Sequence, residues 1–279
     1  EDWDPENHKK RAVVRSNTLF KEFEEKIRQR STIYETEGKS NEGFDEGVDT
    51  YLPSKMIENR PHQGRALSKW KSSGMRGILQ HATGSGKTIT AMAAMESHLD
   101  GGGFVILVVP NTVLQEQWFE ELDCLDVPVN LIGGDGSYID KLEIIEELNL
   151  ASYNTPSVLL FVKNSFVQNT VVNALSNLPK NYMEKILFVA DECHRVGEPS
   201  FSKYVENSVV FPKALGLSAT PFDPSQEYWF EDDNENIQNQ SPEERNQQIT
   251  DLLGDVIDEF SLKDAMENKY LTPYNYKII

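Results

Sequence analysis

The residues best suited to chemistry lie at positions 81–88, which read His-Ala-Thr-Gly-Ser-Gly-Lys-Thr. Glycines in such a loop let backbone N–H groups close round the phosphates of a nucleotide. Lys87 would reach the β and γ phosphates, and the Thr88 hydroxyl would ligate a magnesium ion. We therefore predict an ATP and Mg2+ site at Thr83, Gly84, Ser85, Gly86, Lys87 and Thr88.

An acidic pair, Asp191 and Glu192, follows the apolar run at residues 186–190. At the tip of a strand facing a phosphate loop, Asp191 would hold magnesium through water. Glu192 would orient the attacking water and take its proton. Without a catalytic role, two neighbouring acids are often exposed surface charges. A Gly-Ser-Gly turn without a phosphate would be only a tight connection between two elements. The strict phosphate-loop pattern also has a glycine at the position of His81.

These residues need strands and helices to position them, and short apolar runs alternate with helical patterns along the chain. The expected strands are residues 77–80, 104–109, 129–132, 158–162, 186–190 and 214–217. The expected helices are residues 89–99, 113–122 and 139–148. Strands alternating with helices predict an α/β domain with a mostly parallel sheet and helices on both faces.

Composition sets the class of protein. The chain has 279 residues and a net charge of −18, which argues against a broad basic surface for nucleic acid. Twelve acidic residues and a single basic one, Arg245, lie between Asp223 and Glu259, and we expect a mobile acidic loop at about 223–245. No apolar run is long enough to span a membrane, and two cysteines suit a reducing cytoplasm.

The amino-terminal part differs in character from the rest. Residues 17–30 carry apolar positions at helical spacing, and residues 37–49 are rich in Gly, Glu and Asp. We expect residues 1–50 to be a helix and linker, and residues 51–279 to be the nucleotide-binding domain.

Three segments carry a family resemblance. Residues 82–88 resemble motif I of superfamily II helicases, and Asp191-Glu192-Cys193-His194 resembles motif II of the DExH group. Ser218-Ala219-Thr220 resembles motif III, which links the state of the nucleotide to the grip on nucleic acid. The resemblance implies that His194 couples the nucleotide site to Ser218, Ala219 and Thr220.

Two further segments fit the same family. Arg60 and Gln63 resemble the adenine-reading Q motif, although Gln63 can equally begin a surface helix. Residues after the strand at 104–109 resemble motif Ia, which holds nucleic-acid phosphates, although Thr112 can equally just cap a helix. Motif Ia would supply Pro110, Asn111, Thr112 and Gln117. Residues 163–165 occupy the place of motif Ib but match it poorly.

The resemblance implies a RecA-like P-loop domain, the ATP-binding motor half of an ATP-dependent DNA helicase or translocase. The end of the chain resembles a branch with type III restriction subunits and UvrB-like repair helicases. Expected partners are nucleic acid, with DNA favoured, a second RecA-like domain, and restriction, defence or repair subunits. Without that second domain the isolated chain should hydrolyse almost no ATP. The alternative is an ATP-gated binding or assembly module of a restriction or defence complex that does not unwind.

Overall fold

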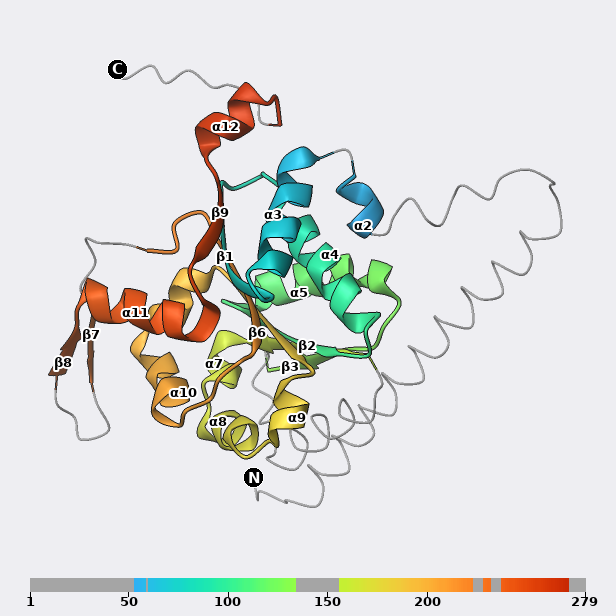
Figure 1. Ribbon diagram of the computed structural model, residues 1–279. Helices are drawn as coiled ribbons and strands as arrows, with labels where there is room; N and C mark the ends of the chain where they lie inside the picture. Colours follow the sequence, from blue (N-terminus) through green and yellow to red (C-terminus); the bar gives the residue numbers. More distant parts are fainter. Residues whose placement is uncertain (1–52, 59, 134–155, 223–227, 232–236, 271–279) are drawn as a thin grey trace, which may run out of the picture. The chain divides into compact units, whose positions relative to one another are not determined.

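The structure of the protein is a computed structural model that describes residues 53–58, 60–133, 156–222, 228–231 and 237–270 (Figure 1). The chain divides into two units, Glu1–Val48 and Asp49–Ile279. Everything below concerns the second unit. The expected helices at residues 17–30 and 139–148 lie outside the described residues.

Seven parallel strands form one sheet in the order β3-β4-β2-β5-β6-β1-β9. Their bounds are β1 Arg76–His81, β2 Phe104–Val109, β3 Val129–Ile132, β4 Val158–Val162, β5 Ile186–Asp191, β6 Lys213–Ser218 and β9 Val256–Phe260. The predicted α/β class is confirmed, and six strands lie where the sequence placed them to within one residue at either end. The seventh, β9, was not expected.

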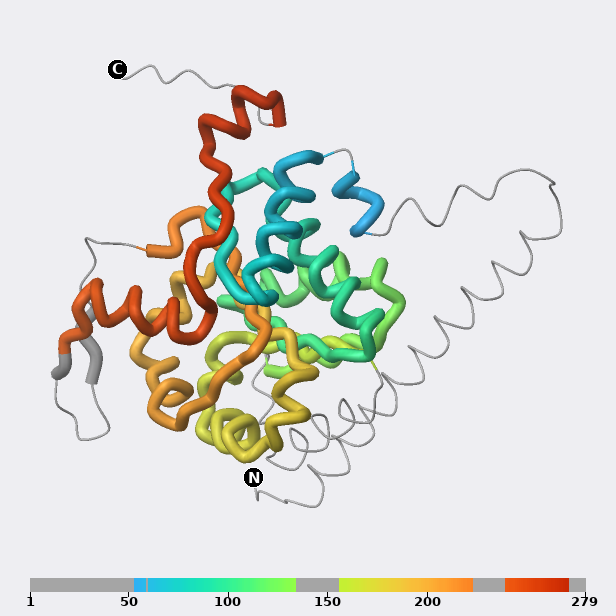
Figure 2. Tube along the Cα trace, in the orientation of Figure 1, coloured from blue at the N-terminus to red at the C-terminus, as the bar shows by residue number. Residues whose placement is uncertain are grey.

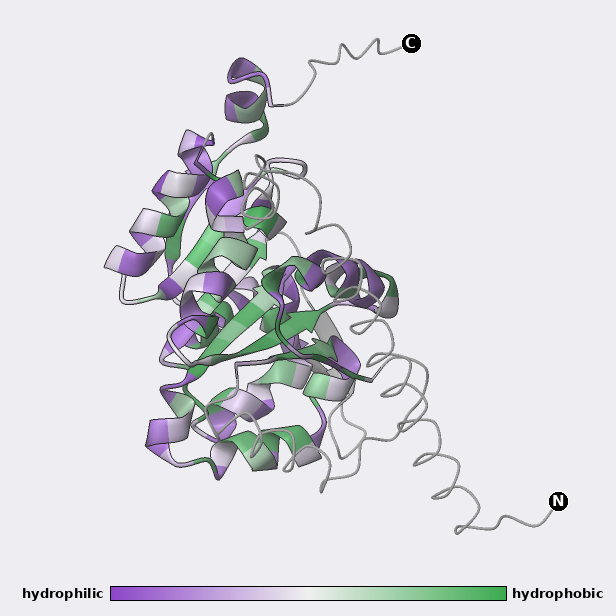
Figure 3. Ribbon diagram, turned by 90° about the vertical axis from the view of Figure 1, so that its right-hand side faces the viewer, coloured by the Kyte–Doolittle hydropathy of each residue, from purple (hydrophilic) through white to green (hydrophobic). Residues whose placement is uncertain are grey.

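The central strands are buried on both faces, which is why their sequences read as continuous apolar runs. Side chains alternate between the faces, so that in β2 Ile106 packs into one core and Leu107 into the other. Figure 3 shows the apolar strands between more polar helices. Two separate cores therefore hold helices on both sides of the sheet, as predicted.

Helices of at least eight residues belong to these two cores. The helices are α3 Pro61–Ser72, α4 Lys87–Leu99, α5 Thr112–Glu121, α8 Asn169–Ser176 and α11 Pro242–Leu253. The shorter ones are α2 Pro53–Met56, α7 Lys163–Phe166, α9 Lys180–Met183, α10 Ser202–Glu206 and α12 Leu262–Glu267. Helices α3, α4 and α5 pack on one face, and α8, α10 and α11 pack on the other.

Between β6 and α11 lies the segment expected to be an acidic loop. Its described residues pair as a two-stranded antiparallel hairpin, β7 Tyr228–Glu231 and β8 Ile237–Gln240. Ser241 then begins α11 with a capping box to Glu244, so an ordered helix starts inside the segment. That the remainder is mobile stays a prediction, since residues 223–227 and 232–236 lie outside the described residues.

After α11 the chain returns to the sheet and adds β9 beside β1, as the trace in Figure 2 shows. Gly254 has φ 93° at the end of α11, a left-handed conformation that favours glycine and turns the chain into β9. β1 therefore lies between β6 and β9 and is not an edge strand. The loop that follows β1 starts from a strand held on both sides.

Candidate active site

The phosphate loop connects β1 to α4, as the sequence predicts. Gly84 and Gly86 have φ of 78° and 86°, which side chains rarely adopt. A Cβ atom at Gly86 would also lie 2.1 Å from Nε2 of Gln63, so position 86 has no room for a side chain. Thr83 and Gly84 are exposed at the tip of the loop, and Thr88 lies in the first turn of α4.

Lys87 begins α4 and folds back over the loop. Its Nζ donates to the carbonyl oxygen of His81 at 2.8 Å and to that of Ala82 at 3.3 Å. Burial lowers the pKa of the Lys87 ammonium, while the charges of Glu192 and Asp191 oppose that shift. The lysine and the acidic pair, which are far apart in the sequence, therefore belong to one electrostatic site.

Asp191 ends β5 with both carboxylate oxygens engaged. Oδ1 accepts a hydrogen bond from the Glu192 backbone N–H at 2.9 Å, and Oδ2 accepts one from the Trp118 indole N–H at 2.8 Å. Burial raises the pKa of the Asp191 carboxyl, and the bond from Trp118 opposes the rise. The sequence placed Asp191 at this strand end but did not indicate Trp118.

Glu192 turns sharply out of β5, with φ 47° in the left-handed region. Such a backbone costs free energy for a residue other than glycine, and strain of this kind clusters at functional sites. Its Oε2 lies 3.4 Å from Nδ1 of His194, a contact that lowers the pKa of the Glu192 carboxyl. Glu192 is therefore ionised at neutral pH, as a general base must be.

The residues expected to couple the nucleotide site to motif III lie close together. β5 and β6 are neighbours, with Asp191 paired to Leu217 in the register. Nδ1 of His194 lies 3.4 Å from Oγ of Ser218, and that Oγ accepts the backbone N–H of Thr220 at 3.2 Å. Ala219 lies between Ser218 and Thr220 in the chain and takes part in neither of these two contacts.

Gln63 lies in α3, and its side chain is fully buried against the phosphate loop. Its Nε2 donates to the carbonyl oxygens of Gly86 at 3.0 Å and Ser85 at 3.3 Å, whereas its Oε1 is buried without a partner. The expected surface helix is thus present, but Gln63 faces inward. Arg60 precedes α3, with Nη1 3.2 Å from the place of a Cβ at Gly86. Reading of adenine by Arg60 and Gln63 stays a prediction.

His81, which replaces the first glycine of the strict loop pattern, is fully buried beside Asp258 of β9. The distance from His81 Nε2 to Asp258 Oδ2 is 2.9 Å, and Arg65 and Lys69 also bind this carboxylate. Burial alone would raise the pKa of Asp258, but the hydrogen bonds from these three side chains lower it to about 2. Burial lowers the pKa of His81 to about 4, so a neutral ring donates to the acid.

This network was missed by the sequence interpretation, and one signal for it was present. Asp258 directly follows two apolar residues, Val256 and Ile257, and an acid that is buried needs positive partners. The stacking of His62 on Phe260, at 4.2 Å between ring centres, joins the same strand to α3.

The residues expected to hold nucleic acid follow β2 at the same carboxyl edge. Pro110 ends the strand, and Asn111, not Thr112, caps α5 by accepting the backbone N–H of Leu114 at 3.0 Å. Asn111 and Thr112 are exposed. Gln117 is exposed farther along α5, where its amide donates to Glu121 at 2.9 Å. Lys163, in the place of motif Ib, begins α7 and pairs with Glu198.

The donor set suits a magnesium nucleotide better than a bare metal. Among the described residues no group of three or more His, Cys, Asp or Glu can hold a metal ion. Mg2+ commonly uses one or two protein oxygens together with substrate phosphates. Asp191 and Thr88 offer such oxygens, and the buried Ser85 hydroxyl in the loop has no hydrogen-bond partner. The residues present therefore fit the magnesium nucleotide that the sequence predicts.

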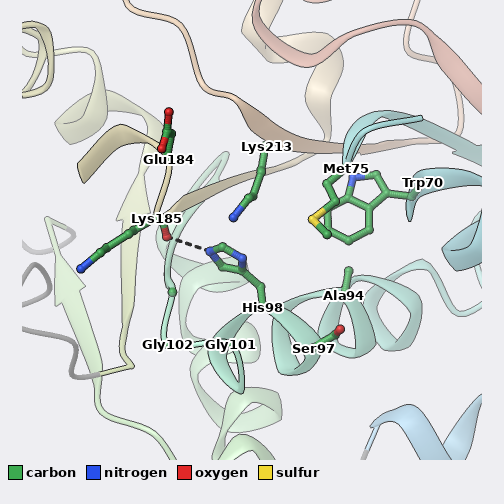
Figure 4. A pocket seen from close by; sticks show the side chains of 11 residues that line it. Trp70, Met75, Ala94, Ser97, His98, Gly101, Gly102, Glu184, Lys185 and Lys213 are labelled. Carbon is green, nitrogen blue, oxygen red and sulfur yellow. Dashed lines mark hydrogen bonds between the residues drawn. The ribbon is translucent and has the colours of Figure 1, made fainter. Parts of the chain in front are cut away.

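A separate cavity of about 440 Å³ lies at the opposite edge of the sheet (Figure 4). Met75, Gly103, Lys185 and Lys213 line it at the amino ends of β1, β2, β5 and β6. The phosphate loop and the acidic pair follow the carboxyl ends, so this cavity is not the nucleotide site.

No helix in the described part of the chain has the length and hydropathy to cross a membrane.

Known proteins with similar sequences include restriction-enzyme subunits and a DNA helicase. Residues 56–223 match the family described as type III restriction enzyme, res subunit. The ATP-dependent DNA helicase RecG of Synechocystis is 28% identical over 235 residues, which cover 78% of this chain and 26% of RecG. The endonuclease subunit of a type I restriction enzyme from Staphylococcus saprophyticus is 25% identical, over 76% of this chain and 21% of that protein.

The fold has a counterpart among solved structures. The helicase domain of Hef from Pyrococcus furiosus aligns with a TM-score of 0.54 at 21% identity, covering 81% of this chain and 43% of that one. The chain spans about a quarter of the length of the two curated relatives. It belongs to the type III restriction enzyme res-subunit family, and its α/β fold is similar to that of the Hef helicase domain.

Proposed function

We propose that this chain is the ATP-binding half of a DNA helicase or translocase, which couples ATP hydrolysis to movement on nucleic acid. One observation carries the proposal. Lys87, the pair Asp191 and Glu192, and the contact between His194 and Ser218 all converge at the carboxyl ends of three adjacent strands, β1, β5 and β6. Ligands of open α/β sheets bind at this edge.

Each residue then has a distinct role. The loop from Thr83 to Thr88 would surround the phosphates, and Lys87 would exchange its two carbonyl partners for phosphate oxygens. Bound Mg2+ would neutralise charge on the phosphates, held by Thr88 and by Asp191 through water. Glu192 orients the attacking water and accepts its proton.

The contacts of His194 explain how the site would sense nucleic acid. Its Nδ1 lies 3.4 Å from both the Glu192 carboxylate and the Ser218 hydroxyl. A shift of motif III at Ser218, Ala219 and Thr220 would therefore move the imidazole and with it the base. The nucleic-acid strand would lie across Pro110, Asn111, Thr112 and Gln117.

The test begins with the 279-residue chain and a fluorescent ATP analogue. Binding should depend on Mg2+ and should be weakened in Lys87→Ala. The longer protein, with its second RecA-like domain, should then hydrolyse ATP faster with DNA and separate strands. Absence of Mg2+-dependent binding by the wild-type chain would refute the nucleotide site.

A second function is favoured by the net charge of −18, which opposes long-range attraction of nucleic acid. In that case the chain is an ATP-gated clamp or assembly module of a restriction or defence complex. It would bind a protein partner in a nucleotide-dependent manner without unwinding, in a reducing cytoplasm. Nucleotide-dependent partner binding without DNA-stimulated turnover would select this function.

A further inference from the structure

The indole of Trp118 connects α5 to the acidic pair across 73 positions of sequence. Trp118 is 2% exposed, and its indole N–H donates to Oδ2 of Asp191 at 2.8 Å. Because the Glu192 backbone N–H engages Oδ1, the carboxylate is held by one donor on each oxygen. Its rotation is thereby restricted, while each oxygen keeps a lone pair for a water molecule or a metal ion.

The helix that carries Trp118 is itself anchored along one face. Asn111 caps its start, and the buried amide of Gln115 donates to the carbonyl oxygen of Leu160 in β4 at 2.9 Å. Positions 111, 115 and 118 are spaced by four and three residues and so lie on one side of the helix. The position of the Trp118 ring is therefore determined by the sheet.

Burial alone does not explain this acceptor. A buried indole N–H needs a partner, and a backbone carbonyl suffices, as Trp70 demonstrates by donating to Ala214 at 2.9 Å. Trp118 donates instead to the carboxylate that faces the phosphate loop. Hydrogen bonds to ionised groups are shorter and stronger than those between neutral groups.

We propose that Trp118 is a positioning residue for Asp191. Its N–H holds the carboxylate in the orientation that receives the magnesium ion of the bound nucleotide, and it ties that orientation to α5. The inference rests on the proposed nucleotide site. It goes further by assigning a role to a side chain outside the motifs that the sequence indicates.

The chain offers a matched control for the test. Trp118→Phe and Trp70→Phe each replace an almost fully buried indole and remove one N–H donor, but only the first donor reaches Asp191. Binding of a fluorescent ATP analogue to the full chain is measured at increasing Mg2+ and also without Mg2+. Thermal unfolding of each variant is recorded alongside.

Trp118→Phe should raise the Mg2+ concentration needed for half-maximal binding by about 10-fold or more, the scale seen when outer partners of metal ligands are removed. Binding without Mg2+ should stay at the wild-type level. Trp70→Phe should change neither quantity. An equal Mg2+ requirement in the two variants, or an equal loss by Trp118→Phe with and without Mg2+, overturns the proposal and leaves the nucleotide site intact.

If Trp118→Phe does not fold, Gln115→Leu serves as the test of whether α5 positions Asp191. It removes the bond from α5 to Leu160 without touching Trp118 or Asp191, and a raised Mg2+ requirement is expected. An unchanged requirement overturns the inference. A wild-type chain without any Mg2+-dependent binding would refute the proposed function itself, so the two failures are distinct.

Discussion

Nδ1 of His194 lies 3.4 Å from Oγ of Ser218, and this contact joins the ends of two neighbouring strands. The same nitrogen lies 3.4 Å from the carboxylate of Glu192. A single imidazole therefore stands between the candidate base and the segment expected to respond to nucleic acid. Loss of either contact should separate nucleotide turnover from nucleic-acid binding.

Ser218→Ala should reduce the stimulation of ATPase by DNA about fivefold or more, the lower range of coupling free energies between sites. Nucleotide affinity should not change, because the Ser218 hydroxyl contacts His194 and Thr220 but not the phosphate loop. The measurement is the ratio of turnover with and without DNA in a protein that joins this chain to the proposed second RecA-like domain. Ser72→Ala, on the surface of α3, is the control. Full stimulation in Ser218→Ala would show that the contact carries no coupling.

Lys87→Ala should weaken nucleotide binding about 10- to 100-fold, since hydrogen bonds to charged groups contribute about 1.5–3 kcal/mol each. Equilibrium titration of the chain with a fluorescent nucleotide in Mg2+ measures it. Lys55→Ala removes an equally charged but exposed lysine of α2 and should bind as the wild type does. Equal affinity of the Lys87 and Lys55 variants would place the phosphates elsewhere.

Glu192→Gln should bind nucleotide as tightly as the wild type but hydrolyse it at least about 10²-fold more slowly, the loss expected without a general base. The amide keeps the shape of the side chain and leaves Asp191 bonded to Trp118. Single-turnover hydrolysis by a protein that joins this chain to the proposed second RecA-like domain, compared with its nucleotide affinity, separates the two effects. Near-normal turnover would mean that another group activates the water.

The pH dependence of stability should reveal buried His81. Burial lowers its pKa from an unfolded value near 6.5 to about 4. Between these two pH values His81 is protonated in the unfolded chain but neutral in the folded chain. The free energy of unfolding is therefore highest above pH 6.5, and it falls by about 2–3 kcal/mol because of His81 as the pH drops from 6.5 to 4. The bond to Asp258 remains, because that pKa of about 2 lies below the window.

Denaturant unfolding at several pH values between 7.5 and 4.5 measures this effect, with each variant referred to its own value at pH 7.5. His62 and His98, whose pKa values burial also lowers, contribute a slope of the same sign in every variant. The slope that His81→Phe removes is therefore the contribution of His81. Identical slopes in wild type and His81→Phe would contradict a neutral, buried ring.

The sequence pattern predicted the central strands of the sheet well, because strands buried on both faces read as continuous apolar runs. Phe104–Val109 and Val158–Val162 are buried along their whole length and rich in β-branched or aromatic side chains, and both were predicted to the residue. Val129–Ile132 was also predicted to the residue, although it is only partly buried. β9 was not predicted because Asp258 and Glu259 interrupt the apolar pattern of Val256–Phe260.

Contacts between distant residues are where the sequence was uninformative. The pairing of His81 with Asp258 spans 177 positions, and that of Trp118 with Asp191 spans 73. Each depends on which strands become neighbours, and nothing local encodes that order. The direction of the Gln63 amide is likewise a matter of packing, since the same helix serves an inward or an outward side chain.

The last prediction concerns the base of the nucleotide. Both hydrogens of the Gln63 amide are directed to Ser85 and Gly86, so only its Oε1 is left to read a base. An acceptor there would receive the amino group of adenine and would repel the carbonyl oxygen of guanine. Because the side chain is fully buried, a base can reach Oε1 only if the residues that cover it move while the two bonds to the loop remain.

Gln63→Ala should therefore lower affinity for both ATP and GTP, by loosening the loop, but it should lower ATP affinity more. The ratio of the two dissociation constants isolates base reading from loop support, because the loop binds phosphates common to both nucleotides. Gln115→Ala removes another buried amide that bonds only to backbone carbonyls in β3 and β4, and it should leave the ratio unchanged. An equal loss of ATP and GTP in Gln63→Ala would assign Gln63 to loop support alone.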